Sequence, residues 1–513
     1  MVTRLIEIPK GSTFRFDGGM ASALPNTNMG PNQAMEVRNV YITPAGGLEK
    51  RRGNEKFNVV AMNVGENVQG LGYYRQQAGS AFLMGISGSK IFKSDNLDGT
   101  FDDITGSVVI TPGQDNTWNH VVMNDYSIFI GGAPDAPIKW TGTGNAVPLG
   151  GTPPQGRFGF QVNNRLFIAS PDGDRSTIFW CALANPEDWT STGSGRADAY
   201  SGDGDTLVGY GILNTDIVYL FKQNSIHQFV VTAAPFPMFT FAENIGAVGR
   251  DAIVVAKGLI YFINPRGKMA IMDGTKFLTA STFPHLHDID DVWENVNQDR
   301  LSQIKGFFYT GKDFEHVVWL VPQGTSTTNN VALIWDIRNQ VWLRHPSGFK
   351  ANVAVVTQDK QLYTGHYDSF VYHQDVDGDY SDASESPGAI DGYWKGGWLT
   401  PGGLQESIRP FKLNVVLFSQ LQGQMTVQYG YDFNEGIKSQ TLNMATPGGI
   451  WGLFNWGVGN WGAQDDLIRT IFLRGRGNSF QVIFQNATEN QHFRLHGWSI
   501  SGVPAGQKLF GTV

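Results

Sequence analysis

Short apolar runs alternate with glycine- and asparagine-rich turns over most of the chain between residues 60 and 375. "SAFLMGISGSKIFKSD" (80–95) and "DIVYLFKQNSIHQFVV" (216–231) show the form, which is an apolar strand, a turn and a second strand. Such units recur roughly every 35–50 residues, which is the length of one four-stranded propeller blade. The pattern predicts an all-β protein with a β-propeller of about seven blades. Six or eight blades, or a stack of β-sandwiches, are the alternatives.

The pattern changes toward both ends of the chain. Longer alternating strands such as "SIRPFKLNVVLFS" (407–419) predict a β-sandwich or jelly-roll-like domain at the C-terminal end. The stretch 36–57 resembles a hairpin, and it could supply the strand that closes the propeller ring. We therefore expect an extended N-terminal arm (1–35), a propeller (36–380) with a short helical insertion near 285–304, a linker (381–397) and a C-terminal β-sandwich (398–513).

Charge is sparse and unevenly spread. Charged residues are 16 % of the chain, against about 25 % in an average globular protein, and the formal net charge is −8. A net acidic chain does not attract nucleic acid as a whole. Residues 1–60, however, hold eight basic and five acidic side chains, and this contrast favours head-to-tail docking between unlike surfaces. The predicted docking residues are Arg38, Lys50, Arg51 and Arg52.

Cysteine content and hydropathy limit the cellular compartments that the sequence is suited to. The single cysteine, Cys181, lies in an apolar run and excludes disulfides within one chain. The N-terminus lacks the apolar core of a signal peptide, and no stretch approaches the ~18 uninterrupted apolar residues of a membrane helix. We expect a protein without a membrane span, made in a cytoplasm and used as a soluble or assembled body.

Few residues suggest catalytic or metal chemistry. Asp375, Asp377 and Asp379 occupy the first, third and fifth positions of a calcium loop, but Tyr380 stands where the loop needs glycine and Ser386 where it needs glutamate. A solvated turn is the favoured interpretation, with an opportunistic cation site as the weaker one. The sequence contains no nucleophile elbow, phosphate-binding glycine loop or dinucleotide fingerprint. We therefore predict a protein that is not an enzyme and that needs no cofactor.

A tryptophan repeat is the most unusual local feature. In "GGIWGLFNWGVGNWGAQ" (448–464), Trp451, Trp456 and Trp461 are five residues apart, a spacing that fits neither a helix nor a strand. Indoles on a glycine-rich loop can stack on sugars or on bases, but residues 448–466 contain no lysine or arginine to hold phosphates. Packing against the same chain or a neighbouring subunit is the favoured role.

Several segments together resemble one protein family. "NVYITPAGGLEKRRGNEKF" resembles the N-terminal signature of tail hub or nozzle proteins of short-tailed bacteriophages, which include packaged-DNA stabilisation and tail tubular proteins. "VALIWDIRNQVWLRH" resembles a blade strand of that family through Trp335, Asp336 and Trp342. The matching positions in the first segment are Asn39, Gly46, Gly47, Leu48, Arg51, Arg52 and Gly53, with arginine where proline is common.

The resemblance implies a structural virion protein of the phage tail, assembled in the host cytoplasm. It would form a ring, usually of six copies, that extends the portal channel, retains packaged DNA and conducts it during ejection. The implied partners are further copies, a portal adaptor or head-to-tail connector above, and a tail needle, fibre or tip protein below. DNA would pass without specific binding. The alternative is a carbohydrate-binding propeller module for receptor recognition at a tail tip or cell surface.

Overall fold

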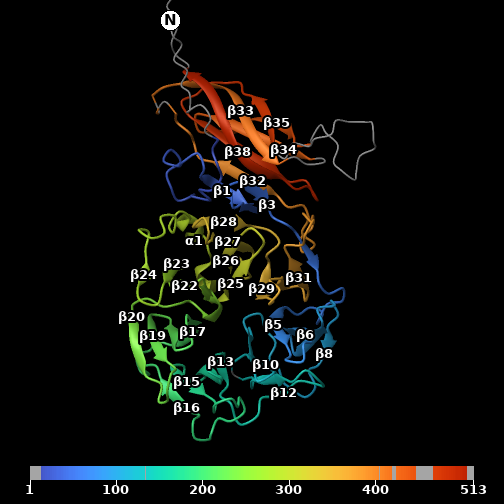
Figure 1. Ribbon diagram of the computed structural model, residues 1–513, viewed down its shortest axis with the longest axis vertical. Coiled ribbons are helices and arrows are strands. Elements are labelled where there is room, and N and C mark those ends of the chain that lie inside the picture. The colour runs from blue at the N-terminus through green and yellow to red at the C-terminus, as the bar shows by residue number, and fades with distance from the viewer. Residues whose placement is uncertain are drawn as a thin grey trace, which may run out of the picture.

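Seven four-stranded antiparallel sheets form a ring in the part of the chain that the computed structural model describes, which is residues 13–132, 134–401, 403, 405–418, 423–445 and 466–504 (Figure 1). The innermost strands of the seven sheets contact one another in cyclic order. The protein is a β-propeller, and the prediction of about seven blades is confirmed.

Each blade is a meander that runs from the axis outward, as the strand order of its sheet shows. The second strand of each blade is buried on both faces because each blade packs between two neighbours, so its sequence is a nearly continuous apolar run. The first four blades contain β5 (Val68–Arg75), β6 (Ala81–Ser87), β7 (Lys90–Asp95) and β8 (Asp102–Asp103); β9 (Asn119–Met123), β10 (Tyr126–Ile130), β11 (Ile138–Trp140) and β12 (Val147–Pro148); β13 (Gly156–Val162), β14 (Arg165–Pro171), β15 (Thr177–Trp180) and β16 (Gly195–Asp198); and β17 (Leu207–Ile212), β18 (Ile217–Lys222), β19 (Ser225–Val230) and β20 (Met238–Glu243).

The last three blades follow the same plan, and a short helical insertion separates the fifth from the sixth. They contain β21 (Ile253–Ala256), β22 (Leu259–Ile263), β23 (Met269–Met272) and β24 (Phe277–Leu278); β25 (Lys305–Thr310), β26 (Glu315–Val321), β27 (Val331–Asp336) and β28 (Val341–His345); and β29 (Ala351–Val356), β30 (Leu362–His366), β31 (Val371–Gln374) and β4 (Asn54–Lys56). The insertion holds α1 (Asp290–Glu294) and the 3₁₀ turn η2 (Gln298–Gln303), and a second 3₁₀ turn, η1 (Arg250–Ala252), precedes β21. Both α1 and η2 lie in the stretch near 285–304 for which a helical insertion is predicted.

The seventh blade is completed by a strand from the start of the chain. Its outer strand is β4, which pairs antiparallel with β31 through Asn54↔Gln374 and Lys56↔Tyr372. These partners are more than 300 positions apart in sequence, so their pairing joins the beginning of the propeller to its end. The stretch 36–57 therefore supplies the closing strand, but only through its last residues.

The remaining strands form two five-stranded sheets, which we call the two-sheet unit. One sheet has the order β1 (Ala34–Arg38), β32 (Gly392–Gly396), β37 (Phe480–Asn486), β34 (Gln424–Tyr431) and β35 (Asn434–Asn443). The other has the order β2 (Val40–Ile42), β3 (Leu48–Lys50), β38 (Arg494–Pro504), β33 (Ile408–Phe418) and β36 (Asp466–Phe472). Trp394 of the first sheet and Trp498 of the second are both buried, with ring centroids 6.3 Å apart.

The structure divides the chain differently from the predicted boundaries. Strands β1 to β3 lie in the stretch assigned to the propeller or its arm, and β32 lies in the predicted linker, yet all four belong to the two-sheet unit. Part of the predicted arm also packs on the same chain, because Phe14 N donates to Trp498 O at 2.7 Å and Phe16 is fully buried. Local alternation identified strands here, but it carries no information on which distant strand completes each sheet.

A buried ion pair joins the two-sheet unit to the propeller. Arg51 follows β3 directly, and its guanidinium donates to both carboxylate oxygens of Asp382, with both side chains only 1 % exposed. Arg51 also donates to Asn39 Oδ1 at 3.1 Å and to Ser347 Oγ at 3.0 Å. Asp382 in turn accepts a bond from Asn54 Nδ2 of β4 at 3.2 Å. The Arg51 guanidinium therefore links the end of β3 to the connection between blades six and seven, which contains Ser347. Through Asp382 it is also linked to the closing strand β4.

Replacing Arg51 is expected to destabilise the whole fold. An Arg51→Met variant leaves the Asp382 carboxylate buried without its counter-charge, so the free energy of unfolding should fall by about 3–5 kcal/mol. Arg52→Met removes the adjacent, partly exposed cation and should cost less than about 1 kcal/mol. Urea denaturation of both variants measures the difference. Equal losses in the two variants would contradict a special role for the buried pair.

Candidate functional site

Two of the four predicted docking cations cannot meet a partner. Lys50 and Arg51 are buried within the chain, and the prediction that they form a docking surface is wrong. Lys50 Nζ donates to Asn486 Oδ1 at 2.9 Å and to Thr488 O at 3.0 Å, and burial lowers the pKa of Lys50 to about 8. The net charge of a segment does not reveal which of its cations the fold turns inward, and here two of them hold the chain ends together.

The other two predicted docking cations, Arg38 and Arg52, are partly exposed and paired within the chain. Arg38 lies 3.0 Å from Asp391 and stacks its guanidinium over the ring of Tyr393, 3.9 Å from the centroid. Arg52 lies 3.2 Å from Asp377. Both side chains keep some contact with solvent, so a docking role for them stays a prediction.

The three aspartates of the calcium-like loop do not converge on one point. Asp375 is largely buried and accepts a bond from the Tyr309 hydroxyl at 2.9 Å, whereas Asp377 is 91 % exposed and pairs with Arg52. Asp379 Oδ1 accepts from the backbone N of Ser381 at 2.9 Å. Within the described residues no group of three or more histidine, cysteine, aspartate or glutamate side chains could hold a metal ion. Trp451, Trp456 and Trp461 lie outside the described residues.

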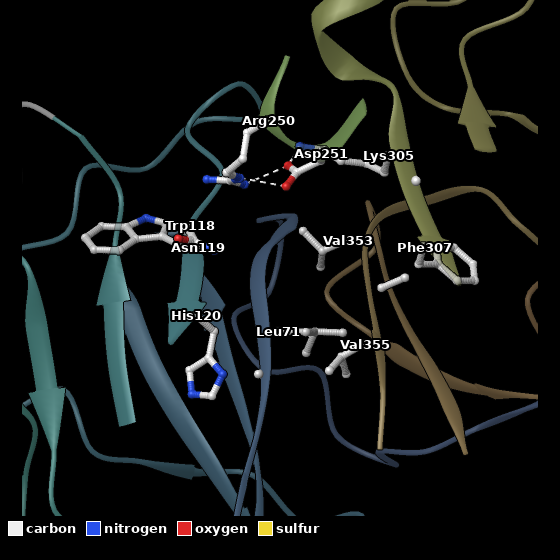
Figure 2. A pocket seen from close by; sticks show the side chains of 13 residues that line it. Leu71, Trp118, Asn119, His120, Arg250, Asp251, Lys305, Phe307, Val353 and Val355 are labelled. Atoms are coloured by element: carbon white, nitrogen blue, oxygen red, sulfur yellow. Dashed lines mark hydrogen bonds and ion pairs between the residues drawn. The ribbon is translucent and has the colours of Figure 1, made fainter. Parts of the chain in front are cut away.

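A cavity of about 200 Å³ lies among the inner strands, near the propeller axis (Figure 2). Its lower wall is formed by apolar side chains of β5 and β29, such as Leu71 and Val353, together with His120 of β9. His120 accepts or donates one bond with Ser127 Oγ at 2.9 Å, and burial lowers the pKa of His120 to about 4. Ser127 is completely buried, so this serine and histidine cannot serve as an accessible nucleophile and base.

A cluster of three charged side chains lies across one end of the cavity. Arg250 and Asp251 of η1 form a bidentate pair, with both nitrogen–oxygen distances at 2.6 Å (Figure 2). Lys305, the first residue of β25, donates to Asp251 Oδ2 at 2.6 Å and to Thr117 Oγ1 at 3.1 Å. Burial alone would raise the pKa of the Asp251 carboxyl, but the two cations hold it well below its usual range. Two cations and one carboxylate leave the cluster with an excess of positive charge.

The charged cluster also lines a second, larger hollow of about 350 Å³. The hollow lies where the inner strands β9, β13, β17, β21 and β25 begin, so it opens at one end of the propeller. Arg157 and Arg175 lie on its wall as half-exposed side chains, and Asp115 is the other carboxylate there. The arrangement is suited to holding an anion.

Inspection of the sequence missed this site, and no local motif could have found it. Arg250, Asp251 and Lys305 lie at the starts of two different blades, and Arg157 and Arg175 belong to a third. Only the closed ring brings them together. The arginine in "GRDA" (249–252) is an ordinary turn residue by its sequence context.

The comparisons with known proteins assign the chain to no family. No protein-family model and no curated protein matches the chain. YCF48 from Cyanidioschyzon merolae is similar in structure at 11 % identity, covering 63 % of this chain and 98 % of its own, with a TM-score of 0.39. The WD40 propeller domain of Doa1 matches at 10 % identity over 63 % and 96 %, with a TM-score of 0.40. The Neurospora crassa Pan2 WD40 domain matches at 7 % over 63 % and 96 %, with a TM-score of 0.38.

Among the residues described above, none of the helices has the length and apolar character that crossing a bilayer requires.

The buried Asp375 predicts a pH-dependent stability. Burial, only partly offset by Arg52, raises the pKa of Asp375 to about 6 in the folded chain. The folded state therefore binds the carboxyl proton of Asp375 more tightly than the unfolded state does. The stability that this protonation provides is lost as pH rises toward and through 6. An Asp375→Asn variant has no such loss, so its unfolding free energy relative to the parent should rise by about 2 kcal/mol between pH ~4.5 and ~7.5.

The exposed neighbour provides the control for that experiment. Asp377→Asn should show the pH profile of the parent, because Asp377 is solvated. Urea denaturation at three pH values measures all three proteins. A constant difference between Asp375→Asn and the parent would mean that Asp375 is ionised in the folded chain throughout this range.

Proposed function

We propose that this chain is a structural virion protein, a subunit of the tail hub or nozzle ring of a short-tailed bacteriophage. In this role it would extend the portal channel, retain packaged DNA and conduct the DNA during ejection. The resemblance of the segments around Asn39–Gly53 and Trp335–Trp342 suggests the role. One structural observation carries the further step that copies of the chain bind one another.

That observation is an apolar surface on the outside of the two-sheet unit. Strands β33 and β36 pair with each other, and β36 alternates between the buried Leu467 and Ile471 and the exposed Ile468 and Phe472. Ile468 is 67 % and Phe472 71 % exposed. Clustered exposed apolar side chains on a sheet are typical of a surface that another protein covers. We name this surface the β33–β36 face; its large exposed apolar residues are Phe411, Phe418, Ile468 and Phe472.

The size of the axial cavity supports a channel between copies rather than through one copy. A cavity of about 200 Å³, closed at one end by Arg250, Asp251 and Lys305, is smaller than a typical small-molecule pocket of about 300–1,000 Å³. It cannot pass a duplex whose major groove alone is ~12 Å wide. If DNA travels past this protein, the bore must therefore be enclosed by several chains, with each propeller as a rigid part of the wall.

The charge of the chain fits a conduit that does not hold its cargo. Double-stranded DNA carries one negative charge every ~1.7 Å of axis, and basic surfaces bind it strongly. Six chains at −8 each give a ring with a formal charge of −48. The walls of such a ring would repel phosphate rather than bind it, while the connector above and the needle, fibre or tip protein below would dock on protein surfaces.

Removing the apolar surface is expected to abolish self-assembly. The parent should form an assembly of about six chains by light scattering, alone or when it adds onto portal complexes. An Ile468→Glu/Phe472→Glu variant should stay monomeric and keep the unfolding temperature of the parent, because both side chains point into solvent. Val60→Glu, another exposed apolar position far from this face in sequence, is the matched control and should assemble normally.

Two results would contradict the proposal. A parent chain that is monomeric at every concentration, both alone and with portal complexes, would exclude the ring. Binding on a glycan array that disappears in a Trp451→Ala/Trp456→Ala/Trp461→Ala variant would instead favour the carbohydrate-binding alternative.

A further inference from the structure

The hollow at the propeller end combines an excess of positive charge with guanidinium donors that make few hydrogen bonds. We propose that it is a binding site for a carboxylate, namely an aspartate or glutamate side chain on an acidic segment of a partner protein. The inference concerns the propeller alone and does not depend on the ring or on passage of DNA. It rests on the charges around the hollow, on the donors that face it and on its size.

The charge of the hollow is opposite to that of the chain. Its lining contains the cations Arg157, Arg175, Arg250 and Lys305 and the carboxylates Asp115 and Asp251. Three more charged groups contact this lining: Asp172 lies 3.2 Å from Arg157, Arg300 lies 3.3 Å from Asp115, and the Asp205 carboxylate accepts from Gln223 N at 3.0 Å. Five cations then face four carboxylates. A protein with a net charge of −8 therefore presents a local excess of one positive charge at this opening, which draws acidic groups toward it.

Two guanidiniums on the wall of the hollow make few hydrogen bonds. Arg157 and Arg175 each place one Nη2 near the same oxygen, Asp172 Oδ1, at 3.2 and 3.4 Å. A guanidinium has five N–H donors in a planar fork that matches a carboxylate. Both side chains are half-exposed, so most of their donors can turn to a ligand at little cost. Asp172 already shows that one carboxylate can lie within reach of both.

The size and the charge of the hollow decide the class of ligand. A volume of about 350 Å³ admits an acidic side chain with its neighbours, whereas a nucleic-acid duplex cannot enter. An excess of one positive charge, with free donors on two guanidiniums, suits one or two added carboxylates. The counter-ions already present are carboxylates as well, and Asp251 accepts a bidentate fork from Arg250. A peptide with adjacent glutamates fits these three features together.

Titration of a short acidic peptide tests the proposal directly. A fluorescently labelled peptide Ac-Gly-Glu-Glu-Gly-NH2 is titrated with the full chain at an ionic strength of about 0.01 M, where charge attraction acts over ~30 Å. We expect saturable binding that weakens with added salt. Arg157→Gln/Arg175→Gln should lower the affinity about tenfold or more, because the variant loses both guanidiniums that would donate charge-assisted hydrogen bonds to the carboxylate. Its unfolding temperature should match that of the parent, since both side chains are half-exposed.

The controls separate this site from general attraction to a positive charge. Lys257→Gln/Lys360→Gln removes two cations from the turns that follow β21 and β29, at the opposite end of the propeller, and should leave the affinity unchanged. The peptide with glutamine in place of glutamate should not bind. Equal binding of the glutamine peptide, no binding to the parent, or an unchanged affinity in the double arginine variant would each overturn the proposal. A DNA duplex that binds through the same arginines, with no binding of the peptide, would overturn it in favour of a phosphate site.

Discussion

Closure of the ring is the constraint on which the rest of the structure depends. Each blade has two apolar faces and is stable only between two neighbours, so seven blades must meet end to end. Strand β4 achieves this by pairing with β31, and it does so only a few residues after β3 has left the two-sheet unit. The short segment from Lys50 to Lys56 therefore belongs to both units. Arg51, near the start of this segment, is held by Asp382, which itself follows the last blade.

This arrangement explains why the first and the last described strands belong to one unit. The two-sheet unit takes three strands from before the propeller and seven from after it, so the propeller is inserted between its two parts. Lys50 bonds to Asn486, and Phe14 bonds to Trp498, which adds further links between the first and last parts of the chain. With an ordered junction of this kind, the propeller is held to the two-sheet unit as one rigid body and is not joined to it by a flexible linker.

The propeller was predictable from the sequence because its strands repeat with a regular spacing and their turns use glycine and asparagine in positions that demand them. Asn163 and Asn164, for example, both have positive φ angles in the turn between β13 and β14. The partner of each strand was not predictable, since β1, β2 and β32 read like any other short strands. Arg51 looked like a surface cation for the same reason: its sequence shows charge, whereas its burial is set by Asp382, more than 300 positions away.

The candidate site was even less predictable from the sequence. Its cations come from three blades, and no two of them are close in sequence except Arg157 and Arg175. Closure of the ring creates the hollow and brings these side chains together on its wall. The axial cavity is too small for a nucleic-acid duplex, so under the proposed function DNA would pass between copies, and the proposed acidic partner would bind at the propeller end.

The central claim is that several copies of this rigid body enclose a channel, and imaging of the purified chain by electron cryomicroscopy tests it most directly. We expect class averages of a closed ring with about six copies, an open central bore and contacts that include the β33–β36 face. Solitary monomers with a bound substrate in the axial cavity, or a ring whose bore is lined by basic side chains, would contradict it.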